Sequence, residues 1–205
     1  MKKGIKIVLI VCLILAIALG IIIPILPFML HWNPAYGEPS IDFPIAEPLN
    51  ITRLSAYNTP NWGQPGKFHN GIDLVIENAT MIISPCFGTI LNINTNANPY
   101  QPGLMMIQVN IKVNLMWTVS LVFEPYSNNT SFNQLQLSLI TVKPGQYVTP
   151  GTEIGKLLNG GEYPHLHYMV SKLFTDVCPY DFSSETAKTI FDEIALRTNS
   201  TICYP

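Results

Sequence analysis

The 205-residue sequence is poor in charge, since Asp, Glu, Lys and Arg together make up 12% of it and the formal net charge is -2. A protein that binds nucleic acid needs clustered basic side chains to neutralise phosphates. With 11 basic residues against 13 acidic ones, the chain offers no basic face, and we expect no nucleic-acid partner. The sequence also lacks internal repeats and low-complexity tracts. Its length therefore favours one domain with appendages.

Long apolar runs are absent with one exception, which extends from Ile7 to Leu30 without a charged side chain. It exceeds the roughly 20 residues needed to cross a hydrocarbon core. Lys2, Lys3 and Lys6 precede it, and the positive-inside rule keeps such residues cytoplasmic. A cleaved signal peptide is the alternative, although its apolar region is usually about 7–15 residues long. We expect residues 1–30 to form a cytoplasmic stub and a single transmembrane helix, with the remainder of the chain outside the cytoplasm.

Residues 31–50 are rich in proline, which disfavours a helix and favours extended chain. The prediction here is a linker that lifts a domain off the membrane. His31 stands beside Trp32 at the predicted membrane boundary, where we expect an interfacial residue and no metal ligand.

Beyond residue 50, short runs rich in β-branched residues alternate with glycine, proline and asparagine, a rhythm typical of β-strands. The runs are IDLVI, TMIIS, GTILNI, LMMIQVNIKV, LMWTVSLVF and LQLSLITV. They predict a mostly β domain over residues 51–176. Residues 177–205 differ, because an apolar stripe at helical spacing predicts a short helix. The stripe consists of Ala187, Ile190, Phe191, Ile194 and Ala195, with Asp181, Ser183 or Ser184 as the cap and Asn199 as the stop.

Cysteine is scarce, with four residues in the chain. Cys12 lies in the apolar run, and Cys86 lies in the apolar context ISPCFGTI, where we expect it to be buried and unpaired. Cys178 and Cys203 bracket the C-terminal segment. In an oxidising compartment a disulfide between them would tie that segment to the domain, and two free thiols are the alternative.

Histidine is equally scarce, and three of the four histidines lie in two compact patterns. In H-N-G-I-D, Gly71 lets the chain turn so that His69 and Asp73 converge. In P-H-L-H-Y-M-V, His165 and His167 are two apart on an expected strand and share one face. Two imidazoles and one carboxylate suit a zinc ion that keeps a fourth position for water. Each pattern alone also fits surface polar residues or a core histidine.

A third segment makes the combination specific. Residues 142–155 read V-x-x-G-x-x-V-x-x-G-x-x-I-G and stand between H-x-G-x-D and H-x-H. This order resembles peptidase family M23, the lysostaphin-type metallopeptidases, over about Lys67 to Val170. The resemblance implies an antiparallel β-sheet or sandwich domain that holds Zn²⁺ with His69, Asp73 and His167 and uses His165 as a catalytic residue. It also implies an endopeptidase whose substrates are peptides of the cell envelope, usually of peptidoglycan.

One departure from the family pattern concerns a further active-site histidine, which usually lies in a Y-x-H-L segment before the glycine-containing hairpin. The corresponding residues, 119–125, contain no histidine. Glu124 lies close to that position and is a candidate for an alternative base or hydrogen-bond acceptor. A structural carboxylate at the rim of the site is the other interpretation.

Two other functions remain open at this point. A catalytically degenerate M23-like module would bind envelope peptides or regulate a partner enzyme without cleaving anything, and the missing histidine favours it. An adaptor of the lipoyl-like or barrel-sandwich type shares the V-x-x-G hairpin. However, it would carry a lysine where this chain has Thr149 and Pro150, and it leaves the histidine and aspartate patterns unexplained.

Overall fold

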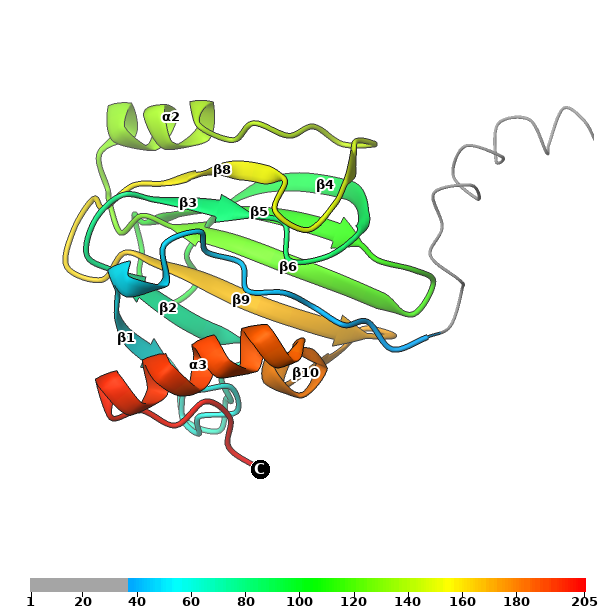
Figure 1. Cartoon of the computed structure of the whole chain (residues 1–205). Coiled ribbons are helices and arrows are strands. Elements are labelled where there is room, and N and C mark those ends of the chain that lie inside the picture. Colours follow the sequence, from blue (N-terminus) through cyan, green and yellow to red (C-terminus); the bar gives the residue numbers. More distant parts are fainter. Residues whose placement is uncertain (1–36) are drawn as a thin grey trace, which may run out of the picture. The chain divides into compact units, whose positions relative to one another are not determined.

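The computed structural model of the chain describes residues 37–205, which form mainly antiparallel strands (Figure 1). The strands are β1 (Ile51–Ser55), β2 (Ile72–Ile76), β3 (Thr80–Ile83), β4 (Gly88–Ala97), β5 (Met105–Lys112), β6 (Trp117–Glu124), β7 (Tyr147–Val148), β8 (Glu153–Leu157), β9 (His165–Lys172) and β10 (Thr175–Val177). The helices are α2 (Thr130–Ser138) and α3 (Glu185–Thr198), with short 3-10 turns η1 (Pro48–Asn50) and η2 (Pro179–Phe182). The mostly β fold predicted from the sequence is confirmed.

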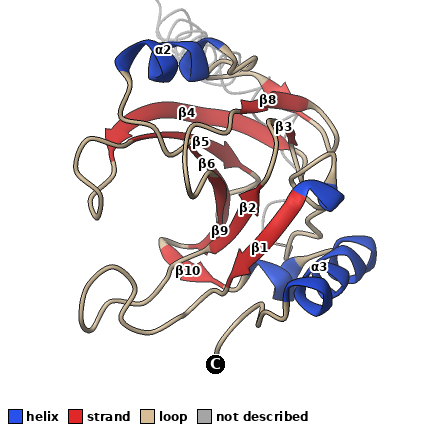
Figure 2. Cartoon of the chain, turned by 90° about the vertical axis from the view of Figure 1, so that its left-hand side faces the viewer, coloured by secondary structure: helices blue, strands red, loops and turns tan. Residues whose placement is uncertain are grey.

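Eight of the strands form one sheet, in the order β1-β2-β9-β6-β5-β4-β7, with β10 also paired to β9. Strands β3 and β8 form a separate two-stranded sheet, and Figure 2 shows how the large sheet curls. The β2–β9 pairing sets Asp73 opposite His167, and the β6–β9 pairing sets Glu124 opposite His165. Sheet register therefore brings together residues that lie far apart in the sequence.

The core lies on the face of β9 that points away from these histidines. Leu166, Tyr168 and Val170 are fully buried there, as the period of two along a strand requires. Phe191 of α3 packs against Tyr168, with ring centroids 6.4 Å apart, and against Phe43, at 4.8 Å. Helix α3 thus covers the apolar side of the sheet and leaves the other side open.

The C-terminal helix has the limits that the sequence predicts. The Ser184 side chain accepts a hydrogen bond from the Ala187 backbone N–H, and Asn199 ends the helix with a left-handed φ of 49°. The disulfide between Cys178 and Cys203 is present, so the predicted tie is confirmed. Cys86 is buried and belongs to no disulfide within residues 37–205.

Part of the predicted linker belongs to the folded domain. Ile41, Phe43 and Ile45 are at most 5% exposed, and Ile41 and Ile45 form β-bridges with Ser183 and Ile82. The alternation of apolar residues puts all three on one face of an extended chain, which buries them against the core. The folded domain therefore includes residues 41–45, which the proline content had led us to assign to the linker.

The run LQLSLITV is not the strand that its alternating leucines predict. Its first half belongs to α2, which Asn129 caps by accepting a hydrogen bond from the Phe132 backbone N–H. Leu135 and Leu137 are 52% and 43% exposed, so the alternation marks no buried face. Gln136 between them is the fully buried residue, and its side chain hydrogen-bonds the backbone of β8 and the residue that follows it.

Within residues 37–205, no helix is both long enough and apolar enough to cross a membrane. The predicted transmembrane helix and His31 lie outside the described residues, so the membrane anchor stays a prediction.

Candidate metal centre and its pocket

Three of the predicted site residues meet at the open face of the sheet. His69 lies in the loop before β2, Asp73 is on β2 and His167 is on β9. Gly71 is required for the close approach of this loop to β9. A Cβ atom added there would lie 2.7 Å from the Tyr168 carbonyl oxygen and 2.8 Å from the His167 ring, so space rather than a left-handed φ demands glycine.

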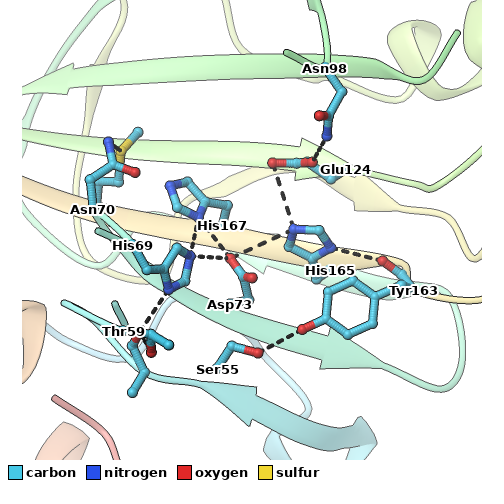
Figure 3. Close-up of polar contacts among 12 residues, drawn as sticks. Ser55, Thr59, His69, Asn70, Asp73, Asn98, Glu124, Tyr163, His165 and His167 are labelled. Atoms are coloured by element: carbon cyan, nitrogen blue, oxygen red, sulfur yellow. Dashed lines mark hydrogen bonds and ion pairs between the residues drawn. The ribbon is translucent and has the colours of Figure 1, made fainter. Parts of the chain in front are cut away.

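The three side chains direct one ligand atom each toward a common point (Figure 3). The Oδ1 atom of Asp73 lies 3.0 Å from Nε2 of His69 and 2.7 Å from Nδ1 of His167. The two imidazole nitrogens are 3.1 Å apart. His69 and Asp73 are each 1% exposed, so this imidazole and this carboxylate are almost completely buried beneath the pocket.

The donor set fits a zinc ion chemically, because two imidazole nitrogens and one carboxylate oxygen are ligands typical of catalytic zinc sites. A second contact orients the first ligand. The Nδ1 atom of His69 lies 2.7 Å from the Ala56 carbonyl oxygen, to which it donates a hydrogen bond, and this leaves the Nε2 lone pair directed at the site. Trp62 stacks on the same ring with centroids 4.2 Å apart, which further restricts its rotation.

His165 lies beside this cluster without joining it. Its Nε2 atom is 3.6 Å from Oδ1 of Asp73 and 3.6 Å from Oε1 of Glu124. Its Nδ1 atom donates to the Tyr163 carbonyl oxygen at 2.8 Å. The ring is therefore anchored through Nδ1, and Nε2 is the atom that faces the two carboxylates.

Glu124 occupies the wall opposite His165, at the end of β6. It is 9% exposed, and its Oε2 atom accepts a hydrogen bond of 2.7 Å from the Asn98 side chain. Val122, two residues earlier, pairs with His167. In the segment where the family pattern has a further histidine, the chain thus presents a valine and a buried carboxylate. A catalytic role for Glu124 stays a prediction.

Charge and burial compete in this cluster. Burial alone would raise the pKa of Asp73, but the positive charge of His165 and hydrogen bonds from His167 and His69 lower that pKa well below its ordinary value. Burial likewise opposes protonation of His165, yet the charges of Asp73 and Glu124 outweigh it and raise the pKa of His165 to about 9. Asp73 therefore favours the anionic form that a cation requires.

The cluster forms the floor of a pocket of about 510 Å³. Its walls include residues that no sequence motif indicated, among them Arg53, Trp62, Asn98, Tyr100 and Tyr163. Tyr163 shows how they are held, since its hydroxyl group lies 2.6 Å from that of Ser55 and its ring packs 4.9 Å from the His165 ring. Such contacts join β1, β9 and the loop before β9, which approach one another only in the folded chain. The only sequence signal for any of these residues is the position of Tyr163, two residues before H-x-H.

Comparison with known proteins gives one family match. The family is described as Peptidase family M23, and its model matches residues 67–179, more than half of the chain. The matched residues include the three converging side chains, His165 and Glu124. No curated protein matches the chain.

Several solved structures are similar to this chain over part of their length. Csd3 of Helicobacter pylori aligns with 78% of this chain at 18% identity and a TM-score of 0.48, and this chain covers 41% of Csd3. A zinc-containing peptidase from Vibrio cholerae aligns with 68% of this chain at 20% identity and a TM-score of 0.47, and 39% of it is covered. The lysostaphin catalytic domain of Staphylococcus simulans aligns with 66% at 21% identity and a TM-score of 0.45, and 93% of it is covered. Because these identities and TM-scores are low, the structures carry no part of the family assignment. The assignment rests on the family match alone.

Proposed function

Because the chain belongs to peptidase family M23, we propose that it is a zinc-dependent endopeptidase that cleaves peptides of the cell envelope. We further propose that residues 1–30 anchor it in the membrane and that the domain lies outside the cytoplasm. One observation carries the enzymatic part of the proposal. His69, Asp73 and His167 direct their ligand atoms to within 4.8 Å of one another on the floor of an accessible pocket.

Zinc is the metal that this donor set favours. His69 Nε2, Asp73 Oδ1 and His167 Nδ1 would hold it. A bound zinc ion supplies Lewis acidity, which activates water and polarises a carbonyl group. The hydrogen bond from His69 to the Ala56 carbonyl oxygen keeps that ligand in the tautomer that binds metal.

His165 and Glu124 supply the proton chemistry in this proposal. With Nδ1 of His165 engaged by the Tyr163 carbonyl oxygen, Nε2 holds the proton that can stabilise or protonate a group in the pocket. Glu124 is close enough to Nε2 to orient the ring or to accept a proton. The Asn98 hydrogen bond fixes the carboxylate in this position.

The experiment compares metal content and peptide cleavage in the purified full chain. We expect one zinc ion per chain and hydrolysis of peptidoglycan cross-linking or stem peptides. His165→Ala should keep the zinc and lose roughly 100-fold or more of the hydrolysis rate, the usual contribution of a general acid or base. Zinc-loaded protein that cleaves none of these peptides would contradict the enzymatic proposal.

A second candidate function is a binding or regulatory module of the same fold that does not cleave its ligand. The observation that favours it is the valine and glutamate on β6 in place of a histidine. Glu124→Gln separates the two candidates, because it keeps the hydrogen-bonding shape and removes the charge. A catalytic Glu124 predicts slower hydrolysis with unchanged zinc content. A binding module predicts no hydrolysis in either protein and unchanged peptide binding.

A further inference from the structure

Two hairpin turns at the end of the sheet remote from the metal centre expose apolar side chains. The β5–β6 turn presents Leu115, and the β9–β10 turn presents Leu173 and Phe174, which are 44%, 55% and 101% exposed. We name these two turns the apolar tips. They lie together, since the Leu173 backbone N–H donates to the Met116 carbonyl oxygen at 2.8 Å and both turns line one shallow hollow of about 240 Å³.

The β9–β10 turn has an unfavourable sequence for its shape. Leu173 and Phe174 have φ angles of 47° and 70°, a left-handed conformation that two-residue turns usually assign to asparagine and glycine. Bulky apolar residues are costly in this conformation, and a fully exposed phenylalanine adds no packing within the domain. Phe174 therefore stabilises neither the turn nor the core, which indicates a role outside the domain.

The described chain begins beside the apolar tips (Figure 1). The Gly37 carbonyl oxygen accepts a hydrogen bond from Asn114 at 3.2 Å, and Glu38 lies 3.7 Å from the Lys172 ammonium group. In the sequence, six residues separate Gly37 from the end of the apolar run at Leu30. Even fully extended, this connection spans at most roughly 25 Å. A membrane that holds residues 7–30 is therefore within reach of the tips.

Basic side chains accompany the apolar ones. Lys112 donates to the Leu115 carbonyl oxygen at 3.1 Å. Lys172, whose ammonium group also faces Glu38, lies over the Trp117 ring, 5.1 Å from its centre. Lysine next to exposed apolar residues is typical of surfaces that enter the boundary between lipid headgroups and acyl chains, where the ammonium groups meet anionic phosphates.

We infer that the apolar tips insert into the outer surface of the bilayer, with Leu115, Leu173 and Phe174 as the inserted residues. The inference rests on the proposed membrane anchor and adds an orientation to it. In the β6–β9 pair, Trp117 faces Lys172 at the end with the tips, and Glu124 faces His165 at the end with the metal centre. Seven steps along the strand separate these ends, about 23 Å. The metal centre and its pocket therefore lie about this far along the sheet from the end that meets the bilayer.

The test measures contact with lipid in the full chain. It is placed in vesicles of phosphatidylcholine and phosphatidylglycerol, some of which carry bromine atoms high on the acyl chains to quench tryptophan. Phe174→Trp adds a reporter at the tip, and Leu196→Trp is the matched control, since Leu196 is 86% exposed on α3. We expect the emission added at position 174 to be quenched and that at position 196 to keep its intensity. Equal emission from both reporters in brominated and plain vesicles would overturn the inference.

A second variant separates docking from folding. Leu173→Asn with Phe174→Gly gives the turn its preferred residues and should not weaken the hairpin. With Leu115→Trp as reporter, we expect quenching in the parent background and its loss in this double variant. Quenching that persists in the double variant would contradict insertion of the β9–β10 turn.

Zinc content and peptide cleavage are measured on the same vesicles. Unquenched tips on a zinc-loaded, active chain would overturn the docking alone. Quenched tips on an inactive chain would support the docking and contradict the proposed activity. Energy transfer between copies of the chain without lipid quenching would assign the tips to a second copy and overturn membrane insertion.

Discussion

The two faces of β9 have opposite chemistry, although they alternate residue by residue. His165 and His167 point to the pocket, where their partners are the carboxylates of Asp73 and Glu124. Leu166 and Tyr168 point to the core and are completely buried. One strand thus carries the candidate chemistry on one face and much of the packing on the other. Substitutions on the pocket face should therefore weaken metal binding, and substitutions on the core face should lower the stability of the fold.

The largest expected effect is on the pocket face. His167→Ala removes one of three ligands, so the affinity for zinc should fall by more than about 100-fold, the upper range for loss of a mere supporting contact. The unfolding midpoint of the metal-free protein should change little. Competition with a metal-binding dye measures the affinity, and His165→Ala is the control that should keep it. Equal affinities in the two variants would contradict the assignment of His167 as a ligand.

On the core face, we expect a loss of stability with an unchanged affinity for zinc. Leu166→Ala leaves a cavity among fully buried side chains, which should lower the free energy of unfolding by roughly 2–5 kcal/mol. Urea unfolding of the metal-free protein measures this change. Below the unfolding transition, the zinc affinity should match that of the unaltered chain. A weaker affinity in the folded variant would mean that the two faces are more strongly coupled than their contacts indicate.

An intermediate effect is expected where α3 is tied to the core face. The disulfide Cys178–Cys203 spans 25 residues that include α3, whose Phe191 packs on Tyr168. Replacing both cysteines by serine should lower the free energy of unfolding by about 2–4 kcal/mol. Thermal unfolding with and without reductant measures it. Reductant should shift the unaltered chain toward the variant and leave the variant itself unchanged.

The smallest effect is expected from the Tyr168 hydroxyl group, a polar atom on the apolar face. It is buried and has no hydrogen-bond partner among residues 37–205, and burial raises the pKa of Tyr168 well above its ordinary value. Tyr168→Phe removes an unsatisfied group, so the free energy of unfolding should stay the same or rise by up to about 1 kcal/mol. Tyr168→Ala is the contrast, with a loss of several kcal/mol. A clearly destabilised phenylalanine variant would show that the hydroxyl group has a partner in solution.

The sequence predicted the parts of the site that depend on local periodicity. Alternation along a strand was enough to place His165 and His167 on one face, and the spacing from Ala187 to Ala195 was enough to define α3. The same rule misled in LQLSLITV, where Asn129 caps a helix and the alternating leucines stay exposed. Alternation predicts a strand only when a core is available to one face.

Residues brought in by tertiary contact could not be predicted in this way. Asn98 reaches Glu124 from the loop after β4, and Trp62 reaches His69 from a loop without regular structure. Neither carries a motif or a period. Ile41, Phe43 and Ile45 alternate in the sequence, but the surrounding prolines favoured a linker. The structure instead buries this segment in the core. These three residues are buried because they contact parts of the domain that are distant in the sequence.

The candidate ligands of the metal centre are far apart along the chain, since Asp73 and His167 are 94 positions apart. A growing polypeptide therefore has no complete site until β9 has been synthesised and has paired with β2. Metal binding would then report the completion of folding, because the unfolded chain offers no assembled site. By mass action, zinc at 1,000 times its dissociation constant would add about 4 kcal/mol to the stability of the native state. A cell that limits the metal would then also limit the lifetime of the protein.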